Sequence, residues 1–278
     1  MEPVEFRRRL HAHPELSFKE HDTAAFIEQQ LDELGIEHRR IASTGVVARI
    51  KGRKTPEGDR RAAVLRADID ALPVTERNDC EWRSQNEGVM HACGHDMHAA
   101  VLFGVLKTFA EAPDFRGTLF GLFQPGEETF EGVRAAIADG LLQNPRPQAA
   151  FAMHVNSQSP LGLVLYGSPA LSGVYGFRIT LQGKGGHGSS PEICIDPITA
   201  GVHVHLALQE LIAREVPAAK EVALTVGKFA GGQAANVIPD TCVLEGTLRG
   251  FDVELMEHLK ERIAEVVNGV AATYRTPA

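Results

Sequence analysis

The sequence lacks three features that would mark a nucleic-acid-binding, membrane or secreted protein. Its 278 residues hold 28 Lys and Arg against 36 Asp and Glu, and the resulting net charge of -8 leaves no broad basic surface for nucleic acid. No apolar run reaches the ~20 residues that a membrane helix needs. A secretory signal requires an apolar run after its basic residues, and no such run follows the basic residues behind Met1. We therefore expect neither nucleic acid nor a membrane as a partner.

Cysteine is also scarce, and its spacing does not suggest a disulfide framework. The four cysteines, Cys80, Cys93, Cys194 and Cys242, stand far apart and form no C-x-x-C pair. In a chain of this size that pattern is typical of reduced thiols in a cytosolic protein. We expect a cytoplasmic location.

The composition is that of an ordinary globular protein, with 44% hydrophobic and 23% charged residues, and the length predicts about two domains. Within residues 1–166, strand patterns occupy 46–50, 62–67, 117–123 and 149–154. Helix patterns alternate with them at 22–34, 96–110 and 132–142, and Asp96 is a candidate cap of the second helix. This order predicts an α/β domain built on a mostly parallel, mixed sheet.

Residues 167–278 show a different pattern. Strand patterns occupy 175–182, 221–229 and 241–249, and helix patterns occupy 197–214 and 253–274, in the order β-α-β-β-α. That order predicts a small α+β domain of the split βαβ, ferredoxin-like type. Such a domain normally has one strand more than the sequence up to Ala278 shows.

Cys93 and His95 belong to the most distinctive local motif, His91-Ala-Cys-Gly-His-Asp-Met-His98. They flank Gly94 directly before a predicted helix, where a turn can direct both side chains into one pocket. A thiolate and an imidazole suit a borderline divalent cation. For Cys-x-His alone, a buried free cysteine beside unrelated histidines is an equally good explanation.

Two adjacent carboxylates, Glu127 and Glu128, end the segment Phe123-Gln-Pro-Gly-Glu-Glu128 after an apolar strand. In an open α/β sheet, ligands bind at that edge. Because neighbouring carboxylates repel, a cation or a proton between them would stabilise the pair. One glutamate can bind metal while the other acts as general base toward a water activated by the cation. Taken alone, adjacent glutamates at an exposed helix start are the commoner explanation.

Further candidates lie at the ends of two other predicted strands. His154 ends an apolar strand, although a lone histidine in that place is more often structural. Asp68 and Asp70 follow the strand at 62–67, and Asp70 is the preferred carboxylate for orienting a metal-bound histidine. Turn chemistry at a strand end is the alternative. Because all these side chains can converge on one sheet edge, their agreement favours a metal hydrolase over coincidence.

Three residues of the second half are candidates for contacting a substrate. His187 lies in the glycine-rich segment Gly183-Lys-Gly-Gly-His187, which has neither the GK[ST] nor the GxGxxG pattern of a phosphate loop. Asn236 in a turn-rich segment and Arg249 at a strand end could hold a carboxylate. Each of the three, taken alone, is more often a structural residue.

Taken together, these motifs resemble the M20 family of metallopeptidases. The resemblance is strongest to its branch with hippurate hydrolase, N-acyl-amino-acid deacylases and auxin-conjugate hydrolases. The matching segments keep the family order and span nearly the whole chain: 8–16, 66–73, 91–98, 123–128, 153–154, 183–187 and 236–240.

The resemblance implies a site for two divalent metal ions, Mn or Zn, with Co or Ni also suitable. Its protein ligands would be Cys93, His95, Glu128 and His154. Glu127 would serve as general base and later as general acid. Such enzymes cleave the amide bond of N-acyl amino acids, hippurate-like or N-acetyl, to a carboxylic acid and a free amino acid.

The resemblance also implies a zinc-peptidase-like catalytic domain at 1–166 and a lid at 167–278. In this family the lid mediates homodimerisation as well, and His187 and Asn236 become substrate-contacting residues. Two alternatives stay open. One is a dipeptidase or aminoacylase with the same site, and the other is an inactive protein that binds metal or dimerises.

In one respect the sequence departs from the family pattern. Family members return from the lid to the catalytic domain and bring a last histidine ligand there. The only histidine beyond His205 is His258, inside a predicted helix. We therefore expect the chain up to Ala278 to lack that ligand and the closing strands, and to have weak or no activity and reduced stability on its own.

Overall fold

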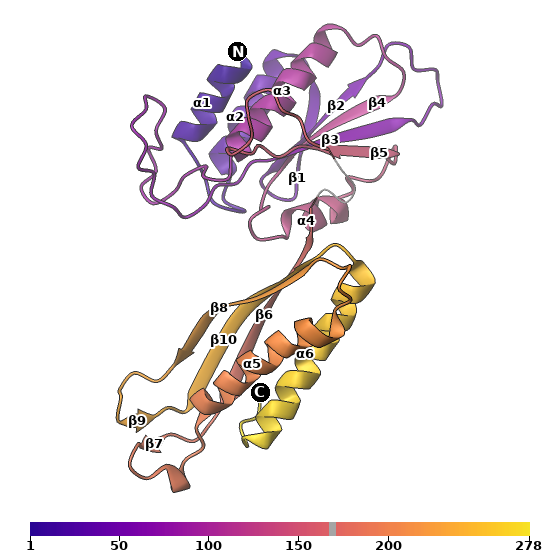
Figure 1. The fold of residues 1–278 in the computed structure, drawn as a ribbon. Coiled ribbons are helices and arrows are strands. Elements are labelled where there is room, and N and C mark those ends of the chain that lie inside the picture. Colours follow the sequence, from indigo (N-terminus) through magenta and orange to yellow (C-terminus); the bar gives the residue numbers. More distant parts are fainter. Residues whose placement is uncertain (167–170) are drawn as a thin grey trace. The chain divides into compact units, whose positions relative to one another are not determined.

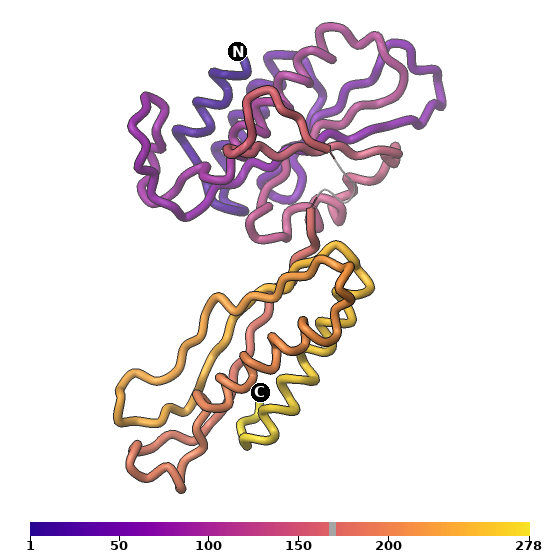
Figure 2. Tube along the Cα trace, in the orientation of Figure 1, coloured from indigo at the N-terminus to yellow at the C-terminus, as the bar shows by residue number. Residues whose placement is uncertain are grey.

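The computed structural model describes residues 1–166 and 171–278. Residue contacts divide the chain into two units, Met1–Leu161 and Gly162–Ala278 (Figures 1 and 2). The predicted domain boundary falls between residues 166 and 167, at the start of residues 167–170, which lie outside the described part. Among the described residues, none of the helices combines the length and the apolar character that crossing a bilayer requires.

Five strands form the sheet of the first unit: β1 (Glu37–Ile41), β2 (Gly45–Lys51), β3 (Ala62–Asp68), β4 (Thr118–Gln124) and β5 (Ala149–Ala152). Their order in the sheet is β1-β2-β4-β3-β5. β3 pairs in parallel with both β4 and β5, whereas the β1-β2 and β2-β4 pairs are antiparallel. The predicted mixed α/β sheet is confirmed. Its antiparallel part arises from the β1-β2 hairpin, whose first strand the sequence analysis does not predict.

The helices of the first unit cover both faces of this sheet: α1 (Pro3–Ala12), α2 (His21–Glu33), α3 (His95–Glu111) and α4 (Gly132–Ala138). Apolar side chains of α1, α2 and α3, among them Phe6, Ile27 and Phe103, form one core with β2 and β4. α4 contributes Ala136 to a second core on the other face. β4 is buried along its whole length, as its nearly uninterrupted apolar sequence requires. No helix is predicted from the sequence at the position of α1.

Three long strands form the main sheet of the second unit: β6 (Gly173–Gln182), β8 (Val222–Gly231) and β10 (Thr241–Gly250). They are antiparallel in the order β6-β10-β8. The helices α5 (Pro197–Glu215) and α6 (Val253–Thr273) pack on this sheet through an apolar core that includes Leu208 and Leu244. Asp196 and Asp252 cap the two helices by accepting backbone hydrogen bonds. The predicted α+β class of this unit is confirmed.

Two short elements complete the second unit. β7 (Gly186–His187) pairs with β9 (Val237–Ile238) in a separate antiparallel hairpin, and a 3-10 helix, η1 (Pro191–Ile193), follows β7. None of the three is predicted from the sequence, where β7 falls in the glycine-rich segment and β9 in the turn-rich one.

Candidate metal centre

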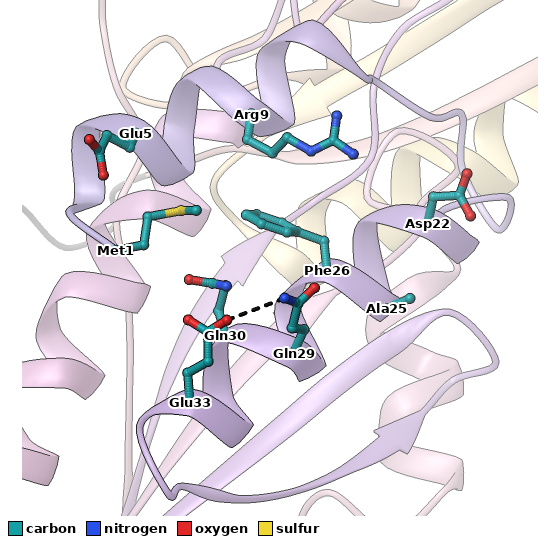
Figure 3. A pocket seen from close by; sticks show the side chains of 9 residues that line it. All are labelled: Met1, Glu5, Arg9, Asp22, Ala25, Phe26, Gln29, Gln30 and Glu33. Atoms are coloured by element: carbon teal, nitrogen blue, oxygen red, sulfur yellow. Dashed lines mark hydrogen bonds between the residues drawn. The ribbon is translucent and has the colours of Figure 1, made fainter.

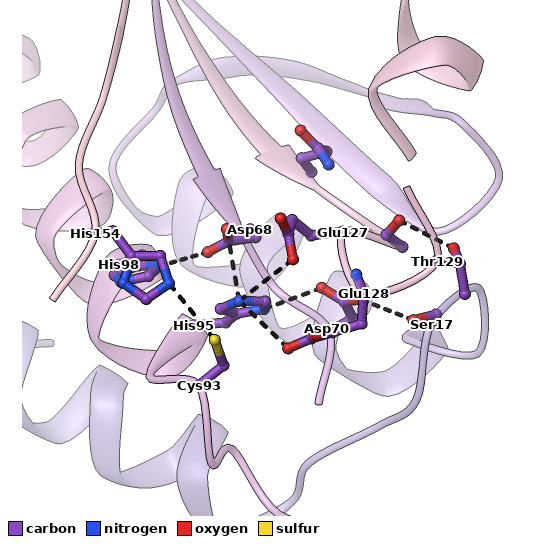
Figure 4. A network of polar contacts seen from close by, with 12 residues as sticks. Ser17, Asp68, Asp70, Cys93, His95, His98, Glu127, Glu128, Thr129 and His154 are labelled. Carbon is purple, nitrogen blue, oxygen red and sulfur yellow. Dashed lines mark hydrogen bonds and ion pairs between the residues drawn. The ribbon is translucent and has the colours of Figure 1, made fainter. Parts of the chain in front are cut away.

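The candidate metal centre lies at one edge of the first sheet, where three parallel strands end. Asp68 is the last residue of β3. Glu127 and Glu128 come shortly after β4, and His154 comes two residues after β5. Because β4, β3 and β5 are parallel neighbours, their carboxyl ends lie side by side, and the side chains that follow them face one another (Figure 4).

A tight turn brings Cys93 and His95 to the same edge. Gly94, at the start of α3, has a φ of 87°. A Cβ atom at this position would lie 2.5 Å from a methyl group of Val155. Both the left-handed backbone and the close approach therefore require glycine. Asp96 does not cap α3 as predicted, because the helix begins at His95 and Gly94 occupies the N-cap position.

His95 is the shared member of the site. Its Nε2 atom lies 3.6 Å from Asp68 Oδ2, 3.9 Å from Glu127 Oε2 and 3.8 Å from Glu128 Oε1. These separations are too long for hydrogen bonds. Two ligands each about 2.1 Å from one tetrahedral cation are about 3.4 Å apart. The spacing therefore suits atoms that share a cation rather than a proton.

Cys93 and His154 complete the cluster from the other side of His95. Cys93 Sγ lies 3.5 Å from His154 Nε2. One donor atom from each of Cys93, His95 and His154 lies within 4.8 Å of the others, and the same holds for His95, Glu127 and Glu128. The structure thus brings together all five residues that the sequence analysis names as ligands or general base.

Two buried ligand atoms of the cluster have no hydrogen-bond partner among the described residues. His95 Nε2 and Glu128 Oε1 are buried and accept no hydrogen bond from any described residue. A buried polar atom without a partner is costly. A divalent cation would satisfy both atoms, and thiolate, imidazole and carboxylate are all ligands that such cations accept. The residues present therefore fit the metal pair that the motifs imply.

The negative charge of the site also favours a bound cation. Burial and the negative charges of Glu128, Glu127 and Asp68 raise the pKa of Cys93 to about 11. Burial, together with the charge of Glu127, also raises the pKa of Glu128 although His95 opposes this. Without added positive charge the thiol stays protonated at neutral pH. A bound cation would supply that charge.

Asp70 is hydrogen-bonded to His95, where a carboxylate that orients a metal-bound histidine is expected from the sequence. His95 Nδ1 donates to Asp70 Oδ1 at 3.1 Å, which leaves the Nε2 lone pair directed into the site. The other carboxylate oxygen accepts from Ser17 Oγ at 2.7 Å and from the Glu128 backbone N–H at 3.0 Å. Burial opposes ionisation of Asp70, but these hydrogen bonds keep its pKa below the usual value. Asp70 therefore connects the His95 ring to the turn that carries Glu128.

A buried ionic network, which the sequence analysis does not predict, holds the first turn of α3. Asp96 Oδ2 accepts from Arg7 Nε at 2.7 Å and from His11 Nδ1 at 2.8 Å. The other ring nitrogen of His11 lies 3.0 Å from Glu76 Oε1. The hydrogen bond to Asp96 is the main reason that the pKa of His11 is raised. The sequence of this region, Phe6-Arg-Arg-Arg-Leu-His11, places charged residues between apolar ones but has no spacing that signals the network.

Glu20 holds the turn that carries the glutamate pair. Its buried carboxylate accepts from Thr44 Oγ1 at 2.5 Å and from the Gly126 backbone N–H at 2.9 Å. Burial raises the pKa of Glu20. Gly126 has a φ of 58° and lies against the ring of Phe18, so a side chain at this position would collide with the ring.

The predicted substrate residues belong to the second unit. His187 lies on β7 and Asn236 directly precedes β9, and the Gly188 N–H donates to the Asn236 carbonyl at 2.8 Å. The structure brings these two residues together within the unit. Arg249 is exposed near the far end of β10, about 25 Å along the strand from Thr241, so it does not join them.

A separate surface pocket lies between α1 and α2 (Figure 3). Its walls are helix surface that carries the apolar Met1 and Phe26 beside polar side chains, and Gln29 Nε2 donates to Glu33 Oε1 at 3.2 Å there. None of the predicted site residues lines it. The pocket is therefore not the candidate site.

Comparison with known proteins decides the family. The family model for peptidase family M20/M25/M40 matches residues 64–274. The chain belongs to this M20 family. The resemblance seen in the sequence motifs is thereby confirmed, and all four proposed metal ligands lie within the matched residues.

Relatives of known name agree with this assignment. The M20 chain is 40% identical over 278 residues to an N-acetyl-L-cysteine deacetylase of Bacillus subtilis (strain 168), an alignment that covers 99% of this chain and 65% of the relative. It is 38% identical over 272 residues to the IAA-amino acid hydrolase ILR1-like 4 of Arabidopsis thaliana, covering 97% of this chain and 60% of the relative. The chain thus spans less than two thirds of the length of either relative.

A solved structure adds information on metal. The YXEP protein of Bacillus subtilis, described as a dinuclear metal binding peptidase from the M20 family, is 35% identical to this chain, with a TM-score of 0.79. The match covers 99% of this chain and 71% of that one. It confirms the fold class of this M20 chain.

Proposed function

We propose that the protein is a metal-dependent amidohydrolase that cleaves the amide bond of N-acyl amino acids. The products would be a carboxylic acid and a free amino acid. One observation carries the proposal: a thiol, two imidazoles and two carboxylates meet at the carboxyl edge of one sheet. The names of the two relatives, a deacetylase of an N-acetyl amino acid and a hydrolase of an amino acid conjugate, support this substrate class.

Four of these side chains would hold two divalent cations. They are Cys93, His95, Glu128 and His154. The thiolate and the imidazoles favour Zn2+, whereas the carboxylate also suits Mn2+, and Co2+ or Ni2+ are compatible with the set. When bound, such cations supply Lewis acidity, which polarises an amide carbonyl and makes water easier to deprotonate.

Glu127 would move the proton. Its side chain is 35% exposed, against 23% for Glu128, so it is the more open of the two glutamates to water and substrate. It would take a proton from the attacking water and give it to the amide nitrogen as the C–N bond breaks. One water molecule is consumed: its OH joins the acyl carbon and its other proton joins the released amine.

His187 and Asn236 would contact the substrate, and the second unit would act as the lid and the dimer interface. These roles follow from the M20 motifs around the two residues. The four free cysteines are in keeping with a cytoplasmic location.

Metal analysis and Glu127→Gln test the proposal. Metal content of the purified chain is measured first because it does not depend on turnover. In an enzyme that also carries the last histidine ligand of the family, Glu127→Gln should keep the metal and lower kcat for N-acetyl amino acids or hippurate by at least about 100-fold, since no group then accepts the proton. The matched control, Glu131→Gln, changes an exposed glutamate of the same segment and should leave kcat unchanged.

Three results would contradict the proposal. Full turnover by Glu127→Gln would remove Glu127 from the proton transfer. Hydrolysis of dipeptides in preference to N-acyl amino acids would make the protein a dipeptidase. A chain that binds neither Mn2+ nor Zn2+ would not be a metal-dependent hydrolase.

His187→Ala tests the substrate contact. The expected result is a KM for N-acyl amino acids raised about tenfold, the effect of losing one hydrogen bond worth about 1.4 kcal/mol, with metal content unchanged. His258→Ala, an exposed histidine on α6, is the matched control in the same unit. An unchanged KM for His187→Ala would remove this residue from the substrate site.

A further inference from the structure

His98 is a buried histidine at the sheet edge that the proposed function leaves without a role. It lies in the first turns of α3 and is 1% exposed. Its Nδ1 atom lies 2.5 Å from Asp68 Oδ1, and the backbone N–H of Val155 donates to its Nε2 atom at 2.9 Å. Because a backbone N–H can only donate, Nε2 is the acceptor and Nδ1 carries the ring proton.

Both ring nitrogens of His98 are therefore occupied. Donor atoms of Asp68, His95 and His98 lie within 4.8 Å of one another, which by distance alone would suit a cation. The lone pair of His98 is nevertheless used by the Val155 N–H. His98 is thus placed to hold the protein around the metal centre rather than to bind metal.

The backbone of Val155 joins His98 to the predicted ligand His154. The Val155 carbonyl accepts from His154 Nδ1 at 2.7 Å, while the N–H of the same residue is held by His98. With Nδ1 fixed in this way, His154 presents Nε2 to Cys93 Sγ at 3.5 Å (Figure 4). The rings of His98 and His154 also meet edge-on, with centroids 4.6 Å apart.

Among the described residues, no strand pairs with the segment around His154 and Val155. The ladder between β3 and β5 ends at Ala152, and His154 lies beyond it as an exposed residue. Val155 packs its side chain on Gly94, beside Cys93. The hydrogen bond from Val155 to His98 is therefore the polar contact that fixes the backbone next to His154.

Asp68 anchors His98 to the sheet. It is 1% exposed, and Arg66 forms an ion pair with its second carboxylate oxygen at 2.9 Å. Arg66 Nε in turn donates to Gln124 Oε1 at 2.8 Å, on the neighbouring strand β4. Burial opposes the ionisation of Asp68, but the hydrogen bond from His98 and the charge of Arg66 keep its pKa below the usual value. The chain of contacts thus runs from β4 through β3 and α3 to the segment after β5.

We propose that His98 is a positioning residue, which orients His154 toward the metal centre by holding the backbone of Val155 with the support of Asp68. The proposal rests on the metal binding proposed above. Hydrogen-bonded groups behind a metal ligand typically change metal affinity 10–100-fold when they are removed.

Two substitutions of His98 separate hydrogen bonding from size. Glutamine can accept from the Val155 N–H and donate to Asp68, whereas leucine can do neither. Cobalt binding to the full 278-residue chain is followed by the absorption bands of Co2+ and by the thiolate-to-cobalt band that reports on Cys93. We expect His98→Leu to weaken Co2+ binding about 10–100-fold and to diminish these bands, and His98→Gln to restore most of the affinity.

A double-mutant cycle with His154→Ala distinguishes positioning from general stability. If His98 acts through His154, His98→Leu should weaken Co2+ binding little further once His154 is absent, so that the two effects are not additive. Unfolding in the presence of chelator shows whether each variant is folded. Should His98→Leu fail to fold, Val155→Pro removes the same N–H donor while His98 stays in place.

The outcomes separate the two proposals. Wild-type protein that binds none of Co2+, Zn2+ and Mn2+ would overturn the proposed function itself. Wild-type protein that binds Co2+, with His98→Leu or Val155→Pro equal to it in affinity and spectrum, would overturn only the role of His98. Fully additive losses for His98→Leu and His154→Ala would do the same.

Discussion

The first unit of the chain buries ionisable side chains at a sheet edge, and the second unit buries almost none. Fourteen of the fifteen buried polar or charged residues in the described part lie in the first unit, and the exception is Thr276. Under the sheet of the second unit the buried side chains are apolar, from Leu181 on β6 to Leu259 on α6. Burying polar groups costs free energy, so the site lowers the stability of the first unit, whereas the buried core of the second unit is stabilised mainly by apolar packing.

Each predicted change below contrasts a residue of one unit with its counterpart in the other. The contrast would fail if a substitution in the second unit changed the stability of the first unit or its affinity for metal. Trp82, the one tryptophan of the sequence, lies in the first unit and reports on its unfolding.

Removing an apolar core residue should have the largest effect on stability. Leu244→Ala leaves a cavity in a fully buried position of the second unit and should lower its free energy of unfolding by about 2–5 kcal/mol. Circular dichroism during chemical unfolding measures this loss. The transition reported by Trp82 and the affinity for Co2+ should stay unchanged.

Leu106→Ala is the matched change in the first unit, again at a fully buried position. It should shift the Trp82 transition by a similar amount. If Leu244→Ala shifts the Trp82 transition as much as Leu106→Ala does, the two units do not unfold separately and the contrast between them fails.

The next largest effect is a pH dependence that belongs to the first unit. Burial lowers the pKa of His91 to about 4, whereas in an unfolded chain histidine titrates near pH 6.5. Between these values the unfolded state binds a proton that the folded state does not. The free energy of unfolding of the metal-free protein should therefore fall as pH drops from 6.5 to 4, by about 3 kcal/mol in all.

His91→Gln should remove this slope, as measured by Trp82 fluorescence at several pH values. The contribution of His11 to the pH dependence has the opposite sign. Its raised pKa stabilises the folded state below pH 6.5, and this stabilisation disappears as pH rises through the pKa of His11 in the folded protein. His258→Gln, exposed in the second unit, is the control and should leave the profile unchanged. A slope that survives in His91→Gln would assign the effect to another group.

The two kinds of cysteine give a sharper comparison. Cys93→Ala should weaken metal binding by at least about 100-fold, or about 2.7 kcal/mol, because it removes a proposed ligand. Cys242→Ala removes a buried thiol of the second unit and should lower stability without changing metal affinity. Metal titration and chemical unfolding of both variants measure this. Equal metal affinity for the two variants would exclude Cys93 as a ligand.

The smallest effect is expected for an exposed ion pair of the second unit. Arg214 pairs with Glu210 one turn away on α5, with both side chains mostly exposed. Arg214→Ala should change the free energy of unfolding by no more than about 0.5 kcal/mol. A loss above about 1 kcal/mol in chemical unfolding would show that this surface carries a contact beyond the pair.

Much of the fold could be predicted because its elements have strong local patterns. The apolar run of β4 and the periodic helices α3, α5 and α6 lie close to their predicted ranges. α1 was missed because three consecutive arginines obscure the apolar positions Phe6 and Leu10. No strand is predicted at β1 because four of its five residues are Glu, His and Arg, so its alternating burial does not appear as alternating hydrophobicity. Such charged residues are typical of a strand at the edge of a sheet.

The amino-acid sequence by itself determined the family, the class of each unit and the residue types of the site, because motif order and hydrophobic period are local properties of the chain. Only the tertiary structure decided how these residues support one another. The pairing of Asp68 with His98, of Asp96 with His11 and of His98 with the Val155 backbone joins residues far apart in sequence. Such contacts depend on strand order and burial, which cannot be predicted from the pattern of neighbouring residues in the sequence.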